Sequence, residues 1–436
     1  MRRSVGGGTV RDGAVRLHGM VKAIPFDAAL HIVQSVAVPR PRPLLVPLDQ
    51  AHGRHLAESI VCPEAWPSTD RSAMDGFALA APAGGLPAGA VLPVVGQSLA
   101  GHPFSGVLPA GAAIRIMTGA VVPAGATAVV PVEQTSGYGR QPGLAGAEVT
   151  LAAAVQPGQH IRRAGSELPA GAEVLTPGRR LFAAEIGVLA VLGRTTVAVA
   201  APVRVAIVAT GDEVVPVDQV PQPHQVRESN SWALAAQVRE VGGEPVRAGI
   251  APDAEGPLRA CLAAAAAAAD VLLTIGGVSA GTHDLVHPAL QSLGFAPQFH
   301  GVELKPGKPT WFGVRHGPGA QFAFGLPGNP ASTFTVFDLL VRPLLLRCLG
   351  GAPSAAALEL PPLGAPWKPN ERLQAIPGQL CATSSGLGVA LARPAPSGDP
   401  FSLLHGQVHA LVPGRVPSGE LAALRVVSGS RPVWLP

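Results

Sequence analysis

Three neighbouring strings of sequence decide the fold: Asp270-Val-Leu-Leu-Thr-Ile-Gly-Gly-Val-Ser-Ala-Gly-Thr-His-Asp284, Leu304-Lys-Pro-Gly-Lys-Pro-Thr310 and Phe324-Gly-Leu-Pro-Gly-Asn-Pro-Ala331. In each, an apolar run typical of a buried strand leads directly into a glycine-rich loop with charged or hydroxyl side chains. This layout is typical of a doubly wound α/β domain, in which loops at the carboxyl ends of parallel strands form a ligand-binding crevice. We therefore expect these loops to form the functional site. Their two lysines and acidic residues suit a polyanion and a metal ion.

Flanking sequence supports the same domain. Val203-Arg-Val-Ala-Ile-Val-Ala209 predicts its first buried strand. Ser229 or Asn230 can cap a following helix, and Gly242 is a suitable stop for that helix. An alanine-rich helix over 254–269 then leads into the first of the quoted strings.

The rest of the chain is divided by changes in composition. Short apolar runs broken by Gly and Pro predict an all-β module that is inserted into a small α+β domain. In that small domain we expect a helix over 26–36, a short strand and a second helix within 44–59, and a helix over 181–192. The expected segments are a flexible leader (1–20), a discontinuous N-terminal domain (21–60 and 157–195), the β module (61–156), the α/β domain (196–349) and a C-terminal β domain (350–436).

Composition excludes several classes of protein. A length of 436 residues predicts several domains, and apolar and charged fractions of 47% and 14% exclude a disordered chain. The net charge of +4 suits a small anionic ligand. No block of basic residues is present, so a nucleic-acid partner is not expected.

Cysteine usage and apolar runs bear on the compartment. The four cysteines (Cys62, Cys261, Cys348 and Cys381) are widely spaced, which argues against a disulfide framework or structural zinc and fits a reducing cytoplasm. Residues 1–20 lack the apolar core of a secretory signal, and Met20 could be the true start. The most apolar run, over 260–269, is too short to span a bilayer.

The first strand ends in Thr210-Gly-Asp-Glu213. This string can be a tight loop with solvated acidic side chains. Alternatively, Asp212 and Glu213 face the crevice and bind Mg²⁺, which prefers hard oxygen ligands. The string alone favours the first interpretation.

The loop from Gly276 to Asp284 can present successive backbone N–H groups to a phosphate, because glycine lets the backbone bend and approach closely. It lacks the Gly-x-Gly-x-x-Gly spacing of dinucleotide-binding proteins. It does contain Gly277-Val-Ser279-Ala-Gly281, the pattern of a serine hydrolase nucleophile elbow. The loop continues beyond Ser279 where an elbow would begin its helix, so a hydrolase is the weaker alternative.

Two further loops carry charge or a helix start. In Lys305-Pro-Gly-Lys308, the prolines restrict the backbone and so hold both ammonium groups in place for a small, dense anion. The alternative, without a binding function, is a rigid turn with two exposed lysines.

In Leu326-Pro-Gly-Asn-Pro330, Asn329 is the expected N-cap and Pro330 the first helical residue. Asp75 and Thr118 lie in loops of the β module, and nothing about either residue alone indicates a function.

Taken together, these strings resemble the molybdopterin molybdenumtransferase (molybdenum insertase) family, which includes the C-terminal domain of gephyrin. The resemblance covers roughly residues 23–427. The strings that carry it are Ser72-Ala-Met-Asp-Gly-Phe-Ala78, Arg115-Ile-Met-Thr-Gly-Ala120 with Glu133, Thr210-Gly-Asp-Glu213, Glu228-Ser-Asn230, Gly276-Gly-Val-Ser-Ala-Gly281 with Asp284, Lys305-Pro-Gly-Lys-Pro309 and Leu326-Pro-Gly-Asn-Pro330.

The resemblance implies a four-domain chain that forms a homodimer with a shared active cleft. It also implies insertion of molybdate into adenylylated molybdopterin with Mg²⁺-assisted release of AMP. Upstream and downstream partners would be a molybdopterin adenylyltransferase and proteins that mature molybdoenzymes. The metal ligands would be Asp212, Glu213 and Asp284; Lys305 and Lys308 would neutralise the anions, and Asp75 and Thr118 would reach across the dimer. The implied cofactor-binding residues are Gly276, Gly277, Ser279, Gly281, Pro327, Gly328, Asn329, Pro330 and Asn230.

Two positions depart from the family pattern. Gly165-Ser166-Glu167 stands where many members have Gly-Glu-Asp, and Gly301 stands where many have a lysine. The first departure keeps open a non-catalytic protein that binds or carries molybdopterin. The sequence leaves the choice between molybdate and tungstate open.

Overall fold

The computed structural model describes residues 23–136, 147–277, 284–317, 320–352, 358–363, 367–393, 395–416 and 422–428. The chain forms two compact units. The first comprises Met1–Ala57, Pro177–Ile186 and Thr196–Pro436, and the second comprises Glu58–Thr176 and Gly187–Thr195. Within the described ranges, no helix is long and apolar enough to cross a membrane. The segment boundaries expected from the sequence stay predictions.

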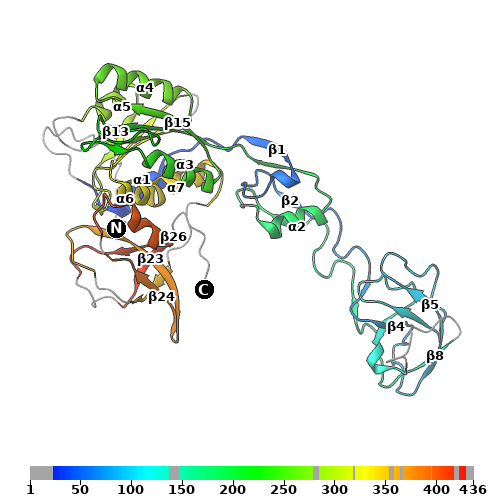
Figure 1. Ribbon diagram of the computed structural model, residues 1–436. Helices are drawn as coiled ribbons and strands as arrows, with labels where there is room; N and C mark the ends of the chain where they lie inside the picture. The colour runs from blue at the N-terminus through cyan, green and yellow to red at the C-terminus, as the bar shows by residue number, and fades with distance from the viewer. Residues whose placement is uncertain are drawn as a thin grey trace, which may run out of the picture. The chain divides into compact units, whose positions relative to one another are not determined.

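A six-stranded sheet is the centre of the first unit (Figure 1). In spatial order its strands are β15 (Glu244–Ala251), β12 (Arg204–Thr210), β16 (Val271–Ile275), β20 (Gln321–Leu326), β19 (Trp311–Arg315) and β17 (Ala296–His300). The first four run parallel, whereas β19 is antiparallel to both β20 and β17. The predicted α/β fold is therefore confirmed, with an antiparallel addition at one edge.

Helices cover both faces of this sheet, as expected for a doubly wound domain. On one face lie α4 (Glu255–Ala267) and α5 (Val286–Ser292). On the other lie α1 (Phe26–Ser35), α3 (Asn230–Val241), α6 (Pro330–Val336), the π-helix η3 (Phe337–Val341) and α7 (Arg342–Cys348). Gly242 ends α3 in the left-handed conformation, at φ 99°, where glycine avoids the strain of a Cβ. The predicted stop is confirmed.

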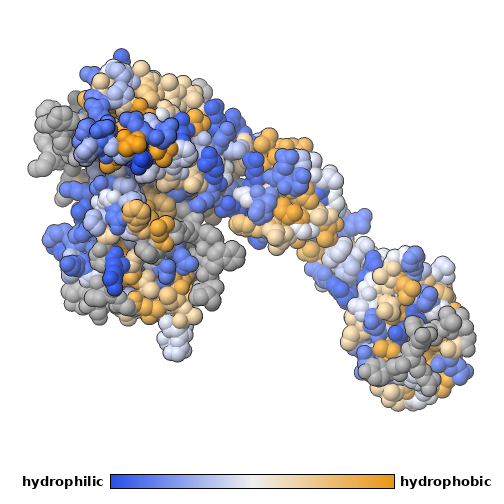
Figure 2. Space-filling view, viewed as in Figure 1, coloured by the Kyte–Doolittle hydropathy of each residue, from blue (hydrophilic) through white to orange (hydrophobic). Residues whose placement is uncertain are grey.

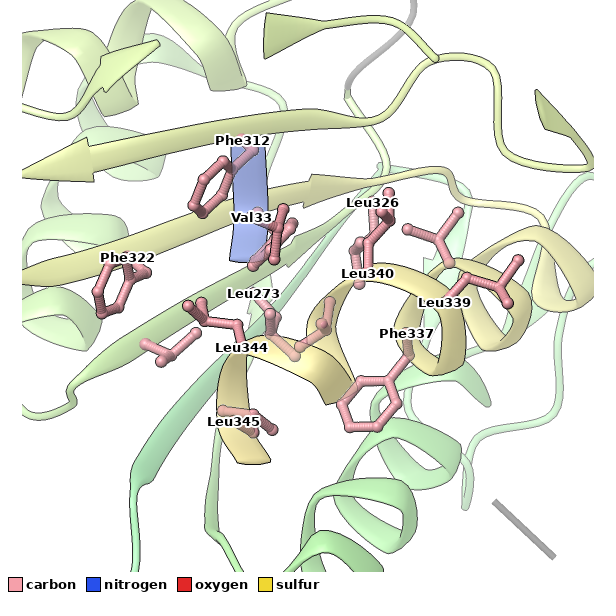
Figure 3. Packing of buried hydrophobic residues seen from close by; sticks show 14 of the residues in the cluster. Val33, Leu273, Phe312, Phe322, Leu326, Phe337, Leu339, Leu340, Leu344 and Leu345 are labelled. Atoms are coloured by element: carbon pink, nitrogen blue, oxygen red, sulfur yellow. The ribbon is translucent and has the colours of Figure 1, made fainter. Parts of the chain in front are cut away.

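The larger core packs the second face of the sheet against these helices (Figure 3). Phe312, Phe322 and Leu273 of the strands belong to the same core cluster as Phe337 and Leu340 of the π-helix, and all five side chains are fully or almost fully buried. Complete burial of one such side chain stabilises the fold by about 1.5–3 kcal/mol. This core fixes the strand ends from which the loops of the site emerge.

A second sheet, formed by the C-terminal segment, adjoins the α/β domain. Its order is β21 (Leu358–Leu360), β26 (Leu424–Ser428), β25 (Val408–Val412), β23 (Leu373–Thr383), β24 (Gly386–Leu391) and β22 (Pro362–Leu363), and a short helix, η4 (Pro400–His405), follows β24. The two-residue strand β18 (Leu304–Lys305) also pairs with β23, with Lys305 opposite Gln374. This pairing ties the lysine loop to the C-terminal sheet.

Two strand pairs complete the first unit: β1 (Pro43–Pro47) with β11 (Thr196–Ala200), and β13 (Val214–Val215) with β14 (Val226–Arg227). The predicted helices over 26–36 and 181–192 are confirmed as α1 and α2 (Ala183–Val191). The second helix expected within 44–59 is wrong, because only the three-residue 3-10 helix η1 (Leu48–Gln50) follows the strand. Pro47 and the turn at Gly53, where φ is 78°, interrupt the chain on either side of it.

Apolar side chains gather on the viewed surface over β1 and α2 (Figure 2). Exposed leucines on β1 are Leu44 and Leu45, at 41% and 66% of their full exposure, and Phe182 just before α2 is 50% exposed. Single exposed apolar residues are common on soluble proteins, whereas a contiguous group of them indicates a surface that contacts another molecule.

The second unit contains a five-stranded sheet of order β7 (Ala128–Pro131), β4 (Gly76–Leu79), β6 (Ala113–Ile116), β5 (Val91–Ser98) and β8 (Glu148–Thr150), with the 3-10 helix η2 (Val132–Gln134) after β7. Two short pairs extend from it: β3 (Arg71–Ser72) with β9 (Ile161–Arg162), and β2 (Ile60–Val61) with β10 (Glu173–Leu175). The predicted all-β character of the inserted module is confirmed.

Candidate active site

Three of the predicted loops leave the central sheet at the carboxyl ends of neighbouring parallel strands, β12, β16 and β20. Ile275 of β16 is in register with Ala209 of β12 on one side and with Leu326 of β20 on the other. The Thr210 hydroxyl donates to the Ile275 carbonyl at 3.1 Å, and the Gly276 N–H donates to the Leu326 carbonyl at 3.0 Å. The parallel pairing therefore brings these loop starts together, as the sequence predicts.

The lysine loop reaches the same edge by a different route. Lys305-Pro-Gly-Lys308 precedes β19, and Trp311 at the start of that strand pairs with Gly325 near the end of antiparallel β20. The expectation that this loop follows a parallel strand of the sheet is wrong. Because β19 runs antiparallel to β20, β19 begins beside the end of β20. The lysine loop before β19 therefore lies beside the other three loops.

Gly276 and Gly277 both need to be glycine. Their φ angles are +85° and +62°, in the region that disfavours other residues. A Cβ on Gly276 would lie 3.0 Å from the Thr210 carbonyl oxygen, and one on Gly277 would lie 2.6 Å from Val286. Ser279 and Gly281 lie outside the described residues.

A cavity of about 760 Å³ opens between these loops. Its walls include Glu213, Asn230, Gly276, Gly277 and the Pro327–Pro330 segment. Most of the residues that the family resemblance assigns to cofactor binding therefore line one cavity. Their assignment as ligands of the cofactor stays a prediction.

Asp212 and Glu213 follow the end of β12, and both side chains are exposed. Asp212 Oδ1 accepts a hydrogen bond of 3.2 Å from the backbone N–H of Asp253, and Glu213 lines the cavity itself. Two accessible carboxylates suit an ion that retains water molecules, as Mg²⁺ does. Their role as metal ligands stays a prediction.

A second cavity, of about 490 Å³, lies between the α/β domain and the C-terminal sheet. Five cationic side chains line it: Lys305, Lys308, Lys368, Arg372 and Arg393. No carboxylate is among its described lining residues. Clustered positive charge without a counter-ion attracts a small, multiply charged anion. The two cavities share Pro309, Pro327 and Asn329 as a common wall.

The lining of the second cavity is held by contacts across the two sheets. Arg372 Nη1 donates to the Leu304 carbonyl at 3.1 Å, beside the strand pairing of Lys305 with Gln374. Asn329 Nδ2 donates to Ser397 Oγ at 2.9 Å. Asn329 is the residue before α6, as predicted, but its side chain makes no cap and instead binds the C-terminal segment.

Asp284 lies with two histidines. Its carboxylate contacts Nδ1 of His287, and the ring centroids of His287 and His300 are 4.1 Å apart. The pKa of His300 is lowered by burial and by His287, whereas Asp284 acts in the opposite direction. The structure thus places the predicted metal ligand in a mixed carboxylate–imidazole group.

Asp75 and Thr118 contact each other in the second unit. Both the N–H and the hydroxyl of Thr118 donate to Asp75 Oδ1, each at 2.7 Å. These two hydrogen bonds hold the pKa of Asp75 below its usual range, so the carboxylate is kept charged. The predicted role of the two residues across a dimer stays a prediction.

The two departures from the family pattern have clear local structures. Glu167 pairs with the guanidinium of Arg162, so its carboxylate already has a partner. Gly301 has φ +90°, and a Cβ there would lie 3.3 Å from Ala23. A longer side chain at this position would require the chain near Ala23 to move.

Sequence reasoning missed the cations of the C-terminal segment and the histidine partners of Asp284. Lys368, Arg372 and Arg393 belong to no motif, and only the three-dimensional contact of the two sheets reveals them. For His287 a signal was present, since Asp284 and His287 are three residues apart at a helix start.

Comparisons with known proteins agree with this geometry. The profile described as MoeA N-terminal region (domain I and II) matches residues 24–193, and that described as probable molybdopterin binding domain matches residues 206–347. The second match contains Ser279 and so disfavours the hydrolase alternative.

Relatives of known name cover most of the chain. Molybdopterin molybdenumtransferase 2 of Mycobacterium tuberculosis is 39% identical over 318 residues, which cover 71% of this chain and 76% of that protein. Molybdopterin molybdenumtransferase of a Nostoc species is 37% identical, over 70% of this chain and 69% of its own length. The structure of a molybdopterin biosynthesis MoeA protein from Pyrococcus horikoshii has a TM-score of 0.73 at 30% identity, covering 95% of this chain and 100% of that chain. This chain therefore belongs to the molybdopterin molybdenumtransferase family.

Proposed function

We propose that this chain inserts molybdenum from molybdate into adenylylated molybdopterin and releases AMP. Membership of the family supports a transferase of molybdenum cofactor biosynthesis. The observation that carries the proposal is the adjacency of two cavities, one lined by five cations and the other by glycine-rich loops and carboxylates. One suits an oxyanion, and the other suits the pterin and its phosphoanhydride.

The cationic cavity would reduce the charge repulsion between the two substrates of this reaction. Molybdate is a dianion that must approach a phosphorylated substrate. At about 4 Å and an effective dielectric constant near 20, each pair of like unit charges costs roughly 4 kcal/mol. Lys305 and Lys308, on a loop restrained by Pro306 and Pro309, would offset this repulsion, and Arg372 lines the same cavity.

The larger cavity, of about 760 Å³, carries the groups for anhydride cleavage. Gly276 and Gly277 let the backbone approach a phosphate, and Glu213 provides a carboxylate at the wall. We assign Mg²⁺ to Asp212 and Glu213, whose accessible oxygens fit its ligand preference; the ion would supply Lewis-acid polarisation of the anhydride. That Asp284 shares this ion stays a prediction, since its carboxylate contacts His287.

The decisive test replaces both lysines, as Lys305→Ala with Lys308→Ala. Molybdate-dependent AMP release by the purified protein should fall by at least 100-fold. The matched control is Arg259→Ala, which removes an exposed cation from α4. This helix lies on the face of the central sheet opposite to α3 and α6. Unchanged AMP release in the lysine variant would refute the role assigned to the cavity.

We further propose that the protein works as a homodimer whose cleft combines the first unit of one chain with Asp75 and Thr118 of the other. The exposed Leu44, Leu45 and Phe182 offer apolar surface for such contact. Mixing Asp75→Asn chains with chains that lack both lysines tests this. If sites are shared, random pairing gives half heterodimers with one intact site each, so about one quarter of the activity should return. No recovery from a mixed dimer would exclude shared sites.

The carrier alternative keeps one supporting observation. Glu167 is paired with Arg162, and Ser166 replaces the glutamate found in many members. A carrier would bind adenylylated molybdopterin without releasing AMP. Single-turnover measurement of AMP distinguishes a carrier from a transferase.

We also propose that the protein works in a reducing cytoplasm, which its free cysteines support.

A further inference from the structure

Arg227 is the one cationic side chain among the described residues that line the larger cavity. Three residues of the same lining are acidic: Glu213, Glu228 and Asp253. Because like charges repel, an anionic substrate that enters this cavity meets more repulsion than attraction from the carboxylates and the single guanidinium. The position of that guanidinium therefore decides where an anionic group of the substrate can bind to a side chain.

A short pair of strands holds Arg227 at the cavity wall. The residue belongs to β14, where it is in register with Val215 of β13. Its Nε donates to the carbonyl oxygen of Gln219, in the loop between the two strands, at 3.1 Å. This hydrogen bond restricts the orientation of a side chain that is otherwise exposed.

The terminal nitrogens of Arg227 remain available to a ligand. With no other described residue does its guanidinium form a hydrogen bond or an ion pair. The adjacent Glu228 has its own partners, since its carboxylate accepts from the N–H and the hydroxyl of Ser231 and lies 3.9 Å from Arg247. The two neighbouring charges thus do not neutralise each other.

We propose that Arg227 binds the phosphate of the adenylyl group, both in adenylylated molybdopterin and in the released AMP. A guanidinium presents two parallel N–H donors, which match two oxygens of a phosphate group. Gly276 and Gly277 line the same cavity and let the backbone approach that phosphate closely. The inference rests on the proposed reaction and adds a residue that recognises the nucleotide part of its substrate.

The two cavities then bind different anions. Five cations line the smaller, cationic cavity, which suits molybdate, and Arg227 is not among them. Arg227 lines only the larger cavity, beside the glycine-rich loop. Loss of its guanidinium should therefore weaken binding of the nucleotide and leave binding of the oxyanion unchanged.

The test measures the affinity of the purified full-length protein for AMP by calorimetry, with Mg²⁺ held constant. Arg227→Ala should weaken AMP binding roughly 10- to 100-fold, because it removes charged hydrogen bonds to the phosphate. Arg227→Lys keeps the charge without the paired donors and should retain part of the affinity. Adenosine lacks the phosphate, so the alanine substitution should not change its binding, and molybdate affinity should also stay the same.

Arg239→Ala is the matched control, because it removes another exposed arginine, from the last turn of α3, and should leave AMP affinity unchanged. Native AMP affinity in the Arg227→Ala protein would overturn the proposal, and so would a native protein that does not bind AMP. Equal losses for AMP and adenosine, or for AMP and molybdate, would also overturn it, since they would show a general disturbance of the site. If the native protein bound AMP through Arg227 but released none from adenylylated molybdopterin, the proposed reaction would fail and the phosphate contact would stand.

Discussion

Asn230 and Gly328 are joined by a hydrogen bond of 2.7 Å from the side-chain Nδ2 of the first to the carbonyl oxygen of the second. Asn230 begins α3, and Gly328 belongs to the loop after β20, so the contact links two strings that are 98 residues apart. Both residues line the larger cavity. The side-chain donor of Asn230 therefore positions the cavity wall, in addition to any contact with a ligand.

Asn230→Asp should lower the melting temperature and the substrate affinity more than Asn230→Ala does. The alanine variant loses one hydrogen bond, worth about 1 kcal/mol, whereas aspartate would set a carboxylate against the Gly328 carbonyl. We expect the order of melting temperatures to be wild type, alanine variant, aspartate variant. Affinity for the adenylylated substrate should follow the same order. Equal values for the two variants would show that the hydrogen bond does not shape the cavity.

Thr118→Val should raise the pKa of Asp75 toward its usual range. The substitution removes the hydroxyl donor, while the backbone N–H of residue 118 still donates to the carboxylate. A carbon-13 NMR titration of the side-chain carboxylates measures this directly. Thr118→Ser retains the hydroxyl and should keep the low pKa. A valine variant that titrates as the wild type would show that the hydroxyl contributes nothing.

Arg372→Ala should weaken oxyanion binding by about 10- to 100-fold, because a hydrogen bond from a charged group contributes about 1.5–3 kcal/mol. Calorimetric titration with molybdate and with tungstate measures the loss, and comparing the two anions shows which one the cavity favours. Arg372→Lys keeps the charge without the paired donors and should fall between. An alanine variant with native affinity would remove Arg372 from the anion site.

Local patterns predicted much of the α/β domain. The strand at Val203–Ala209, the stop at Gly242 and the helix start after Asn329 all depend on neighbours in sequence, and the structure confirms them. The three loops after parallel strands also followed, because parallel strands place their carboxyl ends together.

Long-range pairing could not be predicted in the same way. The antiparallel direction of β19 and the pairing of Lys305 with Gln374 depend on which strands meet in space. The cationic cavity lies between the two parts of the chain that this second pairing joins. His300 likewise reaches His287 through the register of β17 with β19, and no spacing in the sequence encodes it.

Asp338→Asn should lower the free energy of unfolding by about 3 kcal/mol, since a neutral amide replaces the buried carboxylate that pairs with Arg342 and His409. Asp338 is fully buried in the π-helix, where it accepts from Arg342 at 2.9 Å and contacts His409 Nε2 of the C-terminal sheet at 3.0 Å. Calorimetry provides the measurement. Asp399→Asn alters a partly exposed cap of η4 and should cost about 1 kcal/mol or less. Similar losses in both variants would contradict the importance of the buried charge.

His55 should make the first unit sensitive to acid. Its pKa is lowered to about 4 because burial disfavours the imidazolium, and the charge of Arg180 adds to this. An unfolded histidine titrates near pH 6.5, so below that pH the unfolded chain takes up a proton that the folded chain refuses. The stabilisation is complete above pH 6.5 and is lost as pH falls toward 4, by about 3 kcal/mol in total.

The experiment compares His55→Leu with the native protein by calorimetry between pH 7.5 and 4.5. The variant lacks the titrating group, so its melting temperature should fall less steeply on acidification, even if its stability at pH 7.5 is lower. His31→Leu, on the exposed face of α1, controls for the loss of a histidine as such. If both variants changed the slope equally, burial of His55 would not be the cause. A steeper fall in the His55 variant would contradict the direction of the pKa shift, because only a raised pKa gives stability that is retained in acid.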